Sequence, residues 1–204
     1  MNILNDHRRS LVLGIVLAVL LAIGIGGTHF NQAGLARWFH IVAGVFWIGL
    51  LYYFNVAQTP AMADAAADKG GPGGAGISKY VAPRALFWFR WGAVATWLGG
   101  AWLLGASFLS AFTFGGVADP GGHTAYYLRT IGSGAWLGTI MLFNVWVLIW
   151  PNQKKILGMV AATDAEKAKA RRVAGIASRV NYVLSIPMIM CMAGASHGLP
   201  LLGR

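Results

Sequence analysis

The chain has 204 residues, of which 57% are hydrophobic and 11% are charged. A soluble domain has about 25% charged residues, so this composition excludes a soluble enzyme and a disordered chain. The one cysteine, Cys191, has no partner within the chain, which excludes a disulfide scaffold. The formal net charge is +10, but the basic residues lie between apolar runs, which indicates anionic lipid and no nucleic acid. Composition therefore predicts an all-α, polytopic transmembrane helix bundle.

Five apolar runs are long enough to cross a bilayer, which takes about 20 helical residues. They are residues 11–28, 38–58, 86–112, 131–150 and 180–198. The first run has an apolar core too long for a secretory signal, and no Ala-x-Ala cleavage site follows it. We therefore expect a retained anchor and one transmembrane domain over residues 1–204.

Two of the connecting segments differ in kind. Residues 60–83 are rich in Gly and Ala around a Gly-Gly-Pro-Gly-Gly core, which predicts a flexible connector. Residues 163–179 begin with Thr163-Asp-Ala-Glu166, the pattern of a capping box. We expect a basic helix there that contacts lipid headgroups and runs into the fifth apolar run. No internal repeat is evident, so an inverted-repeat transporter is not favoured.

The positive charges predict the orientation. With the N-terminus inside, the cytoplasmic segments hold twelve of the sixteen Lys and Arg residues, and the outer segments hold Arg37, Arg129 and Arg204. Positive charge concentrates on the cytoplasmic side of membrane proteins. We therefore expect a multi-pass protein of the bacterial cytoplasmic (inner) membrane, with a cytoplasmic N-terminus and a periplasmic C-terminus.

Polar residues inside apolar runs are costly and often functional. With this orientation, His40 and His197 fall near the outer ends of the second and fifth runs. Asn55, Arg90 and Asn144 fall in the cytoplasmic halves of their runs. We expect an outer histidine layer and an inner layer of amides and a guanidinium.

His40 is a candidate haem ligand. The spacing places His40, Gly44 and Trp47 on one helical face, and the glycine leaves room for a flat macrocycle. His197, at similar depth, is the candidate second ligand of the iron. In the alternative interpretation, His40 hydrogen-bonds a neighbouring carbonyl and Gly44 permits close helix packing. Because no Cys-x-x-Cys-His occurs, any haem is b-type and not covalently attached.

The inner polar residues also have two interpretations. Arg90 is either a fixed charge for an anionic or planar substrate or a side chain that reaches to the headgroups. Asn55 and Asn144 are suited to binding a heterocycle and to hydrogen bonding between helices, and the second role is favoured. His29 and His123 are expected to be solvated loop residues, and the stripe Gly92/Thr96/Gly99 is expected to be a close-packing face.

Several strings resemble the membrane domain of the bacterial cytochrome-c-coupled urate oxidase family. They occur in order along the chain at Trp38–Gly49, Phe89–Leu98, Ile149–Lys155, Ser178–Tyr182, Ile186-Pro187 and Ser196-His197. The resemblance implies a redox role, since that family oxidises urate to 5-hydroxyisourate and passes electrons to a C-terminal cytochrome c domain. Two departures stand out: the cytochrome domain is missing here, and Gly92 stands where the family carries an acidic residue.

Three functions follow from these observations. The first is a membrane redox subunit that binds haem b near the periplasmic face and exchanges electrons with a periplasmic cytochrome c. The second is a purine (urate) oxidase whose substrate contacts Asn55, Arg90, Asn144 and Asn181. The third is a cofactor-free accessory subunit of a larger respiratory or photosynthetic membrane complex. The redox subunit is preferred, and whether the chain is itself an enzyme stays open.

Overall fold

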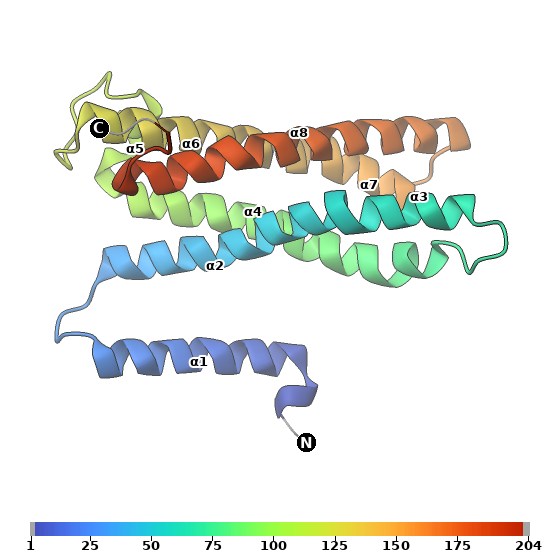
Figure 1. Ribbon diagram of the computed structural model, residues 1–204, viewed down its shortest axis with the longest axis horizontal. Coiled ribbons are helices and arrows are strands. Elements are labelled where there is room, and N and C mark those ends of the chain that lie inside the picture. Colours follow the sequence, from blue (N-terminus) through green and yellow to red (C-terminus); the bar gives the residue numbers. More distant parts are fainter. Residues whose placement is uncertain (1–2, 202–204) are drawn as a thin grey trace. The chain divides into compact units, whose positions relative to one another are not determined.

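The computed structural model describes residues 3–201, which contain helices and no strand (Figure 1). The α-helices are α1 His7–Ile25, α2 Gln32–Tyr52, α3 Thr59–Ala67, α4 Ala82–Leu104, α5 Phe108–Phe112, α6 Ala125–Phe143, α7 Trp150–Ile156 and α8 Asp164–His197. Two short 3₁₀ turns are η1 Ile3–Asn5 and η4 Gly105–Ser107. Three π-helical segments are η2 Tyr53–Gln58, η3 Ile77–Val81 and η5 Asn144–Ile149.

Joined end to end, these elements form five helices that are long and apolar enough to cross a membrane. They are His7–Ile25, Gln32–Ala67, Ile77–Phe112, Ala125–Ile156 and Asp164–His197. Each contains one of the five predicted apolar runs or most of it, so the number and order of the predicted helices are confirmed. Four of the five extend well beyond the apolar run because polar and Ala-rich residues at their ends continue the helix.

The chain divides into two compact units, one up to Gly34 and one from Leu35 onward. The first unit contains α1, none of whose residues is buried. Its N-terminus is capped by the Asp6 side chain, which accepts hydrogen bonds from the backbone N–H groups of Arg8 at 2.8 Å and Arg9 at 3.4 Å. This unit is therefore a single capped apolar helix.

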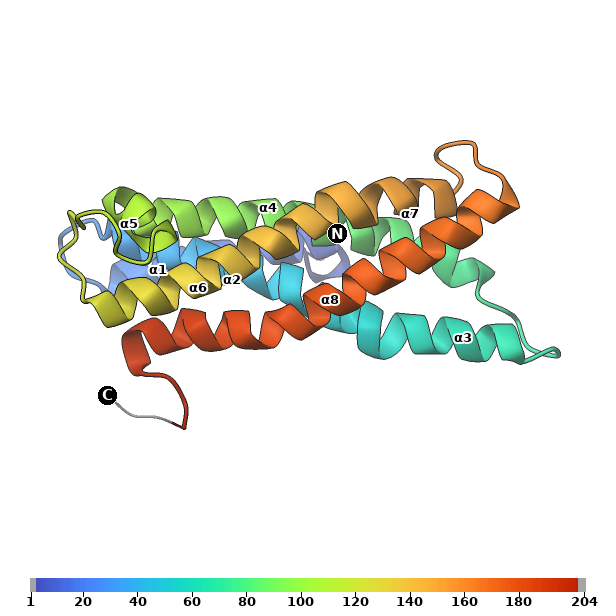
Figure 2. The ribbon, with the colours of Figure 1, turned by 90° about the horizontal axis from the view of Figure 1, so that it is seen from above.

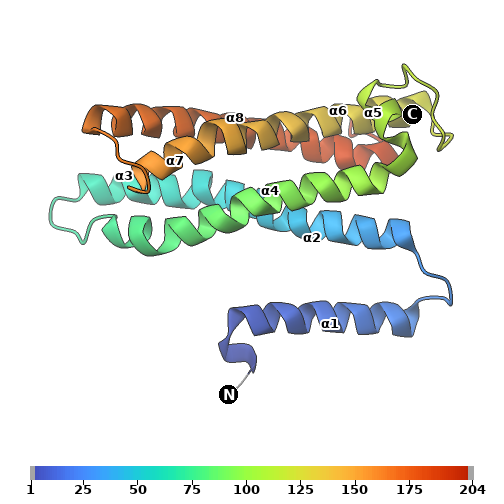
Figure 3. The ribbon, with the colours of Figure 1, turned by 180° about the vertical axis from the view of Figure 1, so that it is seen from behind.

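The second unit is a bundle of the four remaining long helices. Figures 1, 2 and 3 show α3, α7 and the α7–α8 loop at one end, called here the α7 end, and α5 with the α5–α6 loop at the other, the α5 end. Apolar side chains from α2, α4, α6, η5 and α8 form its core. The buried members are Trp47, Leu51, Leu86, Phe89, Ala93, Met141, Val145, Ile149, Ala177 and Met188.

The predictions for the two connecting segments had different outcomes. The expected flexible connector over residues 60–83 is mostly helical, and only residues 68–74 lie outside helices. The Ala-rich part of this segment has a high helix propensity, which outweighs its glycines. The capping box is confirmed: Thr163 N–H donates to Glu166 Oε2 at 2.8 Å, and Glu166 N–H donates to Thr163 Oγ1 at 3.3 Å. The basic helix runs into the last apolar run without interruption. Arg204 lies outside the described residues.

Candidate functional site

The glycine stripe on α4 lies directly against α2. A Cβ atom added at Gly92 would lie 3.3 Å from the backbone nitrogen of Trp47, and one at Gly99 would lie 3.1 Å from the Cα of His40. Thr96 is buried between them. The predicted close-packing face is therefore confirmed. At Gly92, where the resembling family carries an acidic residue, this chain leaves no room for a longer side chain unless α2 moves.

His40 is fixed by this contact. Its Nδ1 lies 2.7 Å from the carbonyl oxygen of Thr96, and because a carbonyl only accepts, Nδ1 carries the proton. A Cβ at Gly100 would lie 3.0 Å from the His40 Cε1, so a glycine is needed beneath the ring. The carbonyl bond that the simpler interpretation predicted is thus present. It also leaves Nε2 with a free lone pair.

Gly44 and Trp47 lie one and two turns further along α2. A Cβ at Gly44 would lie 3.7 Å from the methyl group of Thr96, so α4 occupies the space beside it and close helix packing is observed there. Trp47 is 2% exposed, and among residues 3–201 its indole N–H has no hydrogen-bond partner. Among the described residues, this face of α2 therefore carries an unbonded ring nitrogen, His40 Nε2, and an unpaired donor, the indole N–H of Trp47.

His197 is the last residue of α8, and its side chain is exposed. No hydrogen bond or ring contact joins it to His40 within the described part of the chain. From the middle of the bundle toward the α5 end, α2 and the C-terminal half of α8 diverge (Figures 1 and 2). The structure therefore places the two histidines on separate, diverging helices.

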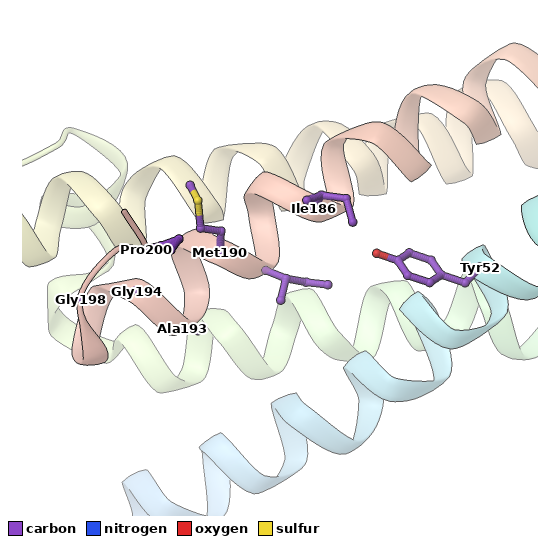
Figure 4. A pocket seen from close by; sticks show the side chains of 8 residues that line it. Tyr52, Ile186, Met190, Ala193, Gly194, Gly198 and Pro200 are labelled. Atoms are coloured by element: carbon purple, nitrogen blue, oxygen red, sulfur yellow. The ribbon is translucent and has the colours of Figure 1, made fainter. Parts of the chain in front are cut away.

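An apolar groove of about 500 Å³ follows this half of α8, with Tyr52 of α2 at its inner end (Figure 4). It is lined by Tyr52, Ile186, Ile189, Met190, Ala193, Gly194, Gly198 and Pro200. His197 follows Ala193 by four residues and Met190 by seven, so helical spacing places it on the groove side of α8. His197 itself is not among the residues that line the groove.

The inner amides bond between helices. Asn144 Nδ2 donates to Asn181 Oδ1 at 2.8 Å, and Asn181 Nδ2 donates to the Met141 carbonyl at 2.9 Å. Asn181 is fully buried. Asn55 Nδ2 lies 2.9 Å from both Ser178 Oγ and a carbonyl one turn earlier on its own helix. The interhelical role favoured by the sequence is observed, and a substrate-binding role for these amides stays a prediction.

The amide donors of Asn55 and Asn144 lie in π-helical segments. Asn55 belongs to η2, and Asn144 is the first residue of η5. A π segment widens the helix and changes which side chains face a neighbour, and such segments are frequent at functional sites. Here they coincide with the contacts to Ser178 and Asn181 of α8.

Arg90 has a separate environment. Its Cζ lies 3.7 Å from the centroid of the Trp150 ring and 5.5 Å from that of Phe87. Within residues 3–201 no hydrogen bond or ion pair joins it to Asn55 or Asn144. The predicted inner layer is therefore two distinct groups: an amide network and a cation on an indole.

The α5–α6 loop holds an ordered pair that the sequence analysis missed. His123 Nδ1 lies 2.8 Å from Asp119 Oδ2, and the His123 backbone N–H donates to the same oxygen at 2.7 Å. The His123 ring stacks on Tyr127 with centroids 4.3 Å apart. Hydrogen bonds from Ser107 and from His123 hold the pKa of Asp119 well below its ordinary value. His123 is an exposed loop residue, as expected, but its ring is held by Asp119 and Tyr127, and the Asp-x3-His spacing was the available signal for this contact.

Comparison with known proteins gives one match. Residues 121–201 match a family described as urate oxidase N-terminal. The match covers less than half of the chain. No curated protein and no solved structure matches the sequence.

The matched region extends from the α5–α6 loop through α6, η5, α7 and α8. It contains the resembling strings at Ile149–Lys155 and from Ser178 to His197, whereas Trp38–Gly49 and Phe89–Leu98 lie outside it. This part of the chain is therefore similar to the urate oxidase N-terminal family, and it includes the bonded pair Asn144 and Asn181.

Proposed function

We propose that the chain is a redox subunit of the bacterial cytoplasmic membrane that binds b-type haem near the periplasmic face and exchanges electrons with a cytochrome c. Five helices of membrane-spanning length and the similarity of residues 121–201 to a family of oxidases support this class of protein. The binding of haem, the orientation in the membrane and the cytochrome c partner are all proposed.

The observation that carries the proposal is the state of His40. A histidine that binds haem iron typically gives its other ring N–H to a carbonyl or carboxylate, which fixes the ring and leaves one nitrogen for the metal. His40 donates Nδ1–H to the Thr96 carbonyl at 2.7 Å. Gly100 leaves space for the ring, so the position of Nε2 is set before any ligand arrives.

His197 is the proposed second ligand. It lies on the groove side of α8, and cofactor sites in helix bundles are built from side chains on facing helices. The groove of about 500 Å³ has an apolar lining and runs between α8 and Tyr52 of α2. Such a lining suits a porphyrin, whose surface is largely apolar. Neither histidine lines the groove, so His40 and His197 would hold one iron only after the outer parts of α2 and α8 come together around the haem, which would supply the one-electron chemistry.

The predicted orientation places this site at the periplasmic side. The cytoplasmic side is then the α7 end, which carries Lys154, Lys155 and the basic residues 167–172 of α8. His40 and His197 lie toward the opposite, α5 end, where a periplasmic cytochrome c would approach. Electron exchange would therefore take place at the α5 end.

The test is the absorption spectrum of the purified chain, oxidised and reduced, with a pyridine haemochrome assay and a titration of the purified protein with haemin. We expect a b-type spectrum that His40→Ala abolishes and that the loop control His123→Ala leaves unchanged. His197→Ala is expected to retain haem with a high-spin spectrum. A chain that neither carries haem nor takes it up, or His40→Ala protein with a normal spectrum, would refute the proposal.

A further inference from the structure

Two cations meet one indole at the α7 end of the bundle. The Cζ of Arg90, from α4, lies 3.7 Å from the centroid of the Trp150 ring, and the Nζ of Lys154, from α7, lies 6.0 Å from it. Trp150 and Lys154 are one helical turn apart on α7. The Arg90–Trp150 contact thus joins two long helices, and the Trp150 ring contacts two positively charged side chains.

Neither cation is neutralised by the protein. Within residues 3–201 the ion pairs join Arg9 to Asp6, His123 to Asp119 and Lys167 to Asp164, and none includes Arg90 or Lys154. The guanidinium of Arg90 also donates no hydrogen bond to the described residues, although it has five N–H donors. Both cations therefore lack a counter-ion among the described residues, and an anion that reached them would lower the cost of keeping these charges at the edge of an apolar region.

A buried donor lies on the same helix as Trp150 and Lys154. Trp146 precedes Trp150 by one turn, and its indole N–H is buried without a partner among the described residues. Its ring packs edge-on against that of Trp91, the neighbour of Arg90, with centroids 5.3 Å apart. A buried N–H without an acceptor costs about 1–3 kcal/mol. Near this end of the helix, the described residues therefore supply neither a negative charge for the two cations nor an acceptor for the Trp146 N–H.

The position of these groups along the helices fits the headgroup layer. Arg90 lies four residues inside the apolar run 86–112, and Trp150 is the last residue of the run 131–150. Tryptophan rings concentrate at the boundary between hydrocarbon and headgroups, and the long arginine side chain extends from the apolar region to that level. The phosphates of lipids lie at the same depth.

We propose that Arg90, Lys154, Trp146 and Trp150 form a binding site for the phosphate group of an anionic phospholipid. Arginine pairs with phosphate through two parallel N–H donors, lysine adds a second charge, and the Trp146 N–H finds an acceptor. Basic pockets between transmembrane helices on the cytoplasmic side bind such headgroups. A zwitterionic lipid brings its own cation and neutralises the two charges less well.

The site is tested by native mass spectrometry and thermal unfolding of the purified chain with phosphatidylglycerol, phosphatidylcholine or inorganic phosphate. We expect phosphatidylglycerol to stay bound and to raise the melting temperature more than the other two. Arg90→Gln and Lys154→Gln should each weaken the binding of phosphatidylglycerol by about tenfold. Lys169→Gln, which removes an exposed charge from α8, is the matched control and should leave it unchanged.

Trp146→Phe keeps a ring and removes only the N–H, so it tests the site even if Arg90→Gln does not fold. It should weaken the binding of phosphatidylglycerol without changing the melting temperature of the lipid-free protein by more than a few degrees. The proposal is overturned if Lys154→Gln and Trp146→Phe bind phosphatidylglycerol as the unmodified chain does. Equal protection by inorganic phosphate would overturn the assignment to a lipid.

Discussion

Replacing the two buried amides singly and together should reveal a measurable coupling between α6–η5 and α8. Asn144 donates to Asn181 at 2.8 Å, and Asn181 donates to the Met141 carbonyl at 2.9 Å. Asn181→Ala therefore removes two hydrogen bonds between helices, whereas Asn144→Ala removes one. Because Asn181 is fully buried, water does not replace the lost partners.

The expected magnitudes follow from the number of bonds. Hydrogen bonds between transmembrane helices average about 0.6 kcal/mol and reach about 1.7 kcal/mol. Asn181→Ala should lower the free energy of unfolding by about 1–3 kcal/mol, and Asn144→Ala by about half as much. The coupling energy of the double-mutant cycle should be about 0.6–1.7 kcal/mol, since both changes remove the same shared bond.

The assay is reversible unfolding in mixed micelles, followed by circular dichroism as the fraction of denaturing detergent increases. Asn152→Ala is the matched control, because Asn152 donates only to the Leu148 carbonyl of its own helix, at 2.7 Å. It should show no coupling to Asn181→Ala. A coupling of zero between Asn144 and Asn181, or one as large for the control, would refute this account of the bundle.

Three further changes have expected outcomes. Gly99→Ala should destabilise the bundle by about 1–3 kcal/mol in the same titration, because its Cβ would lie 3.1 Å from the Cα of His40 in α2. Gly44→Ala is the control and should be tolerated, because its Cβ would lie 3.7 Å from a methyl group. Equal effects of the two changes would contradict the described helix contact. Because the pKa of Asp119 is depressed from its ordinary value of 3.8, the ionised carboxylate stabilises the folded protein above that value, and this contribution is lost as the pH falls from there toward the depressed pKa. Asp119→Asn should therefore reduce the fall in melting temperature between about pH 7 and about pH 2, and an equal fall in both proteins would argue against the pair. Thr163→Ala should cost about 1 kcal/mol in the first turn of α8, seen as faster amide hydrogen exchange there, and unchanged exchange would argue against the cap.

The sequence was sufficient for features that depend on residues close together in the chain. Apolar run length predicts the five helices, because each must satisfy its own backbone in a bilayer. The capping box at Thr163 and Glu166 is local, and it forms as predicted. Residues 60–83 show the limit of this reasoning. The glycines at the centre of this segment predicted a flexible connector, but the alanines before them continue the helix through Ala67.

Contacts between distant segments could not be predicted in the same way. The sequence placed Asn144 and Arg90 at one depth, but depth does not determine the direction of a side chain around its helix. The π segment η5 changes that direction, and no pattern in the sequence indicated it. Asn144 consequently faces Asn181, and Arg90 lies on Trp150 instead of joining the amides.

The bonding of each intramembrane polar group separates two kinds of role. The amides of Asn144 and Asn181 use their donors within the protein, which is what a group that only holds helices together requires. Among residues 3–201, His40 bonds through one ring nitrogen and not the other, and Arg90 donates no hydrogen bond. Retaining polar groups with unused bonding capacity in an apolar environment is costly, so a ligand that supplies the missing partner would bind there with a large gain. For His40 the proposed ligand is an electron-pair acceptor such as iron, and for Arg90 the proposed ligand is an anion.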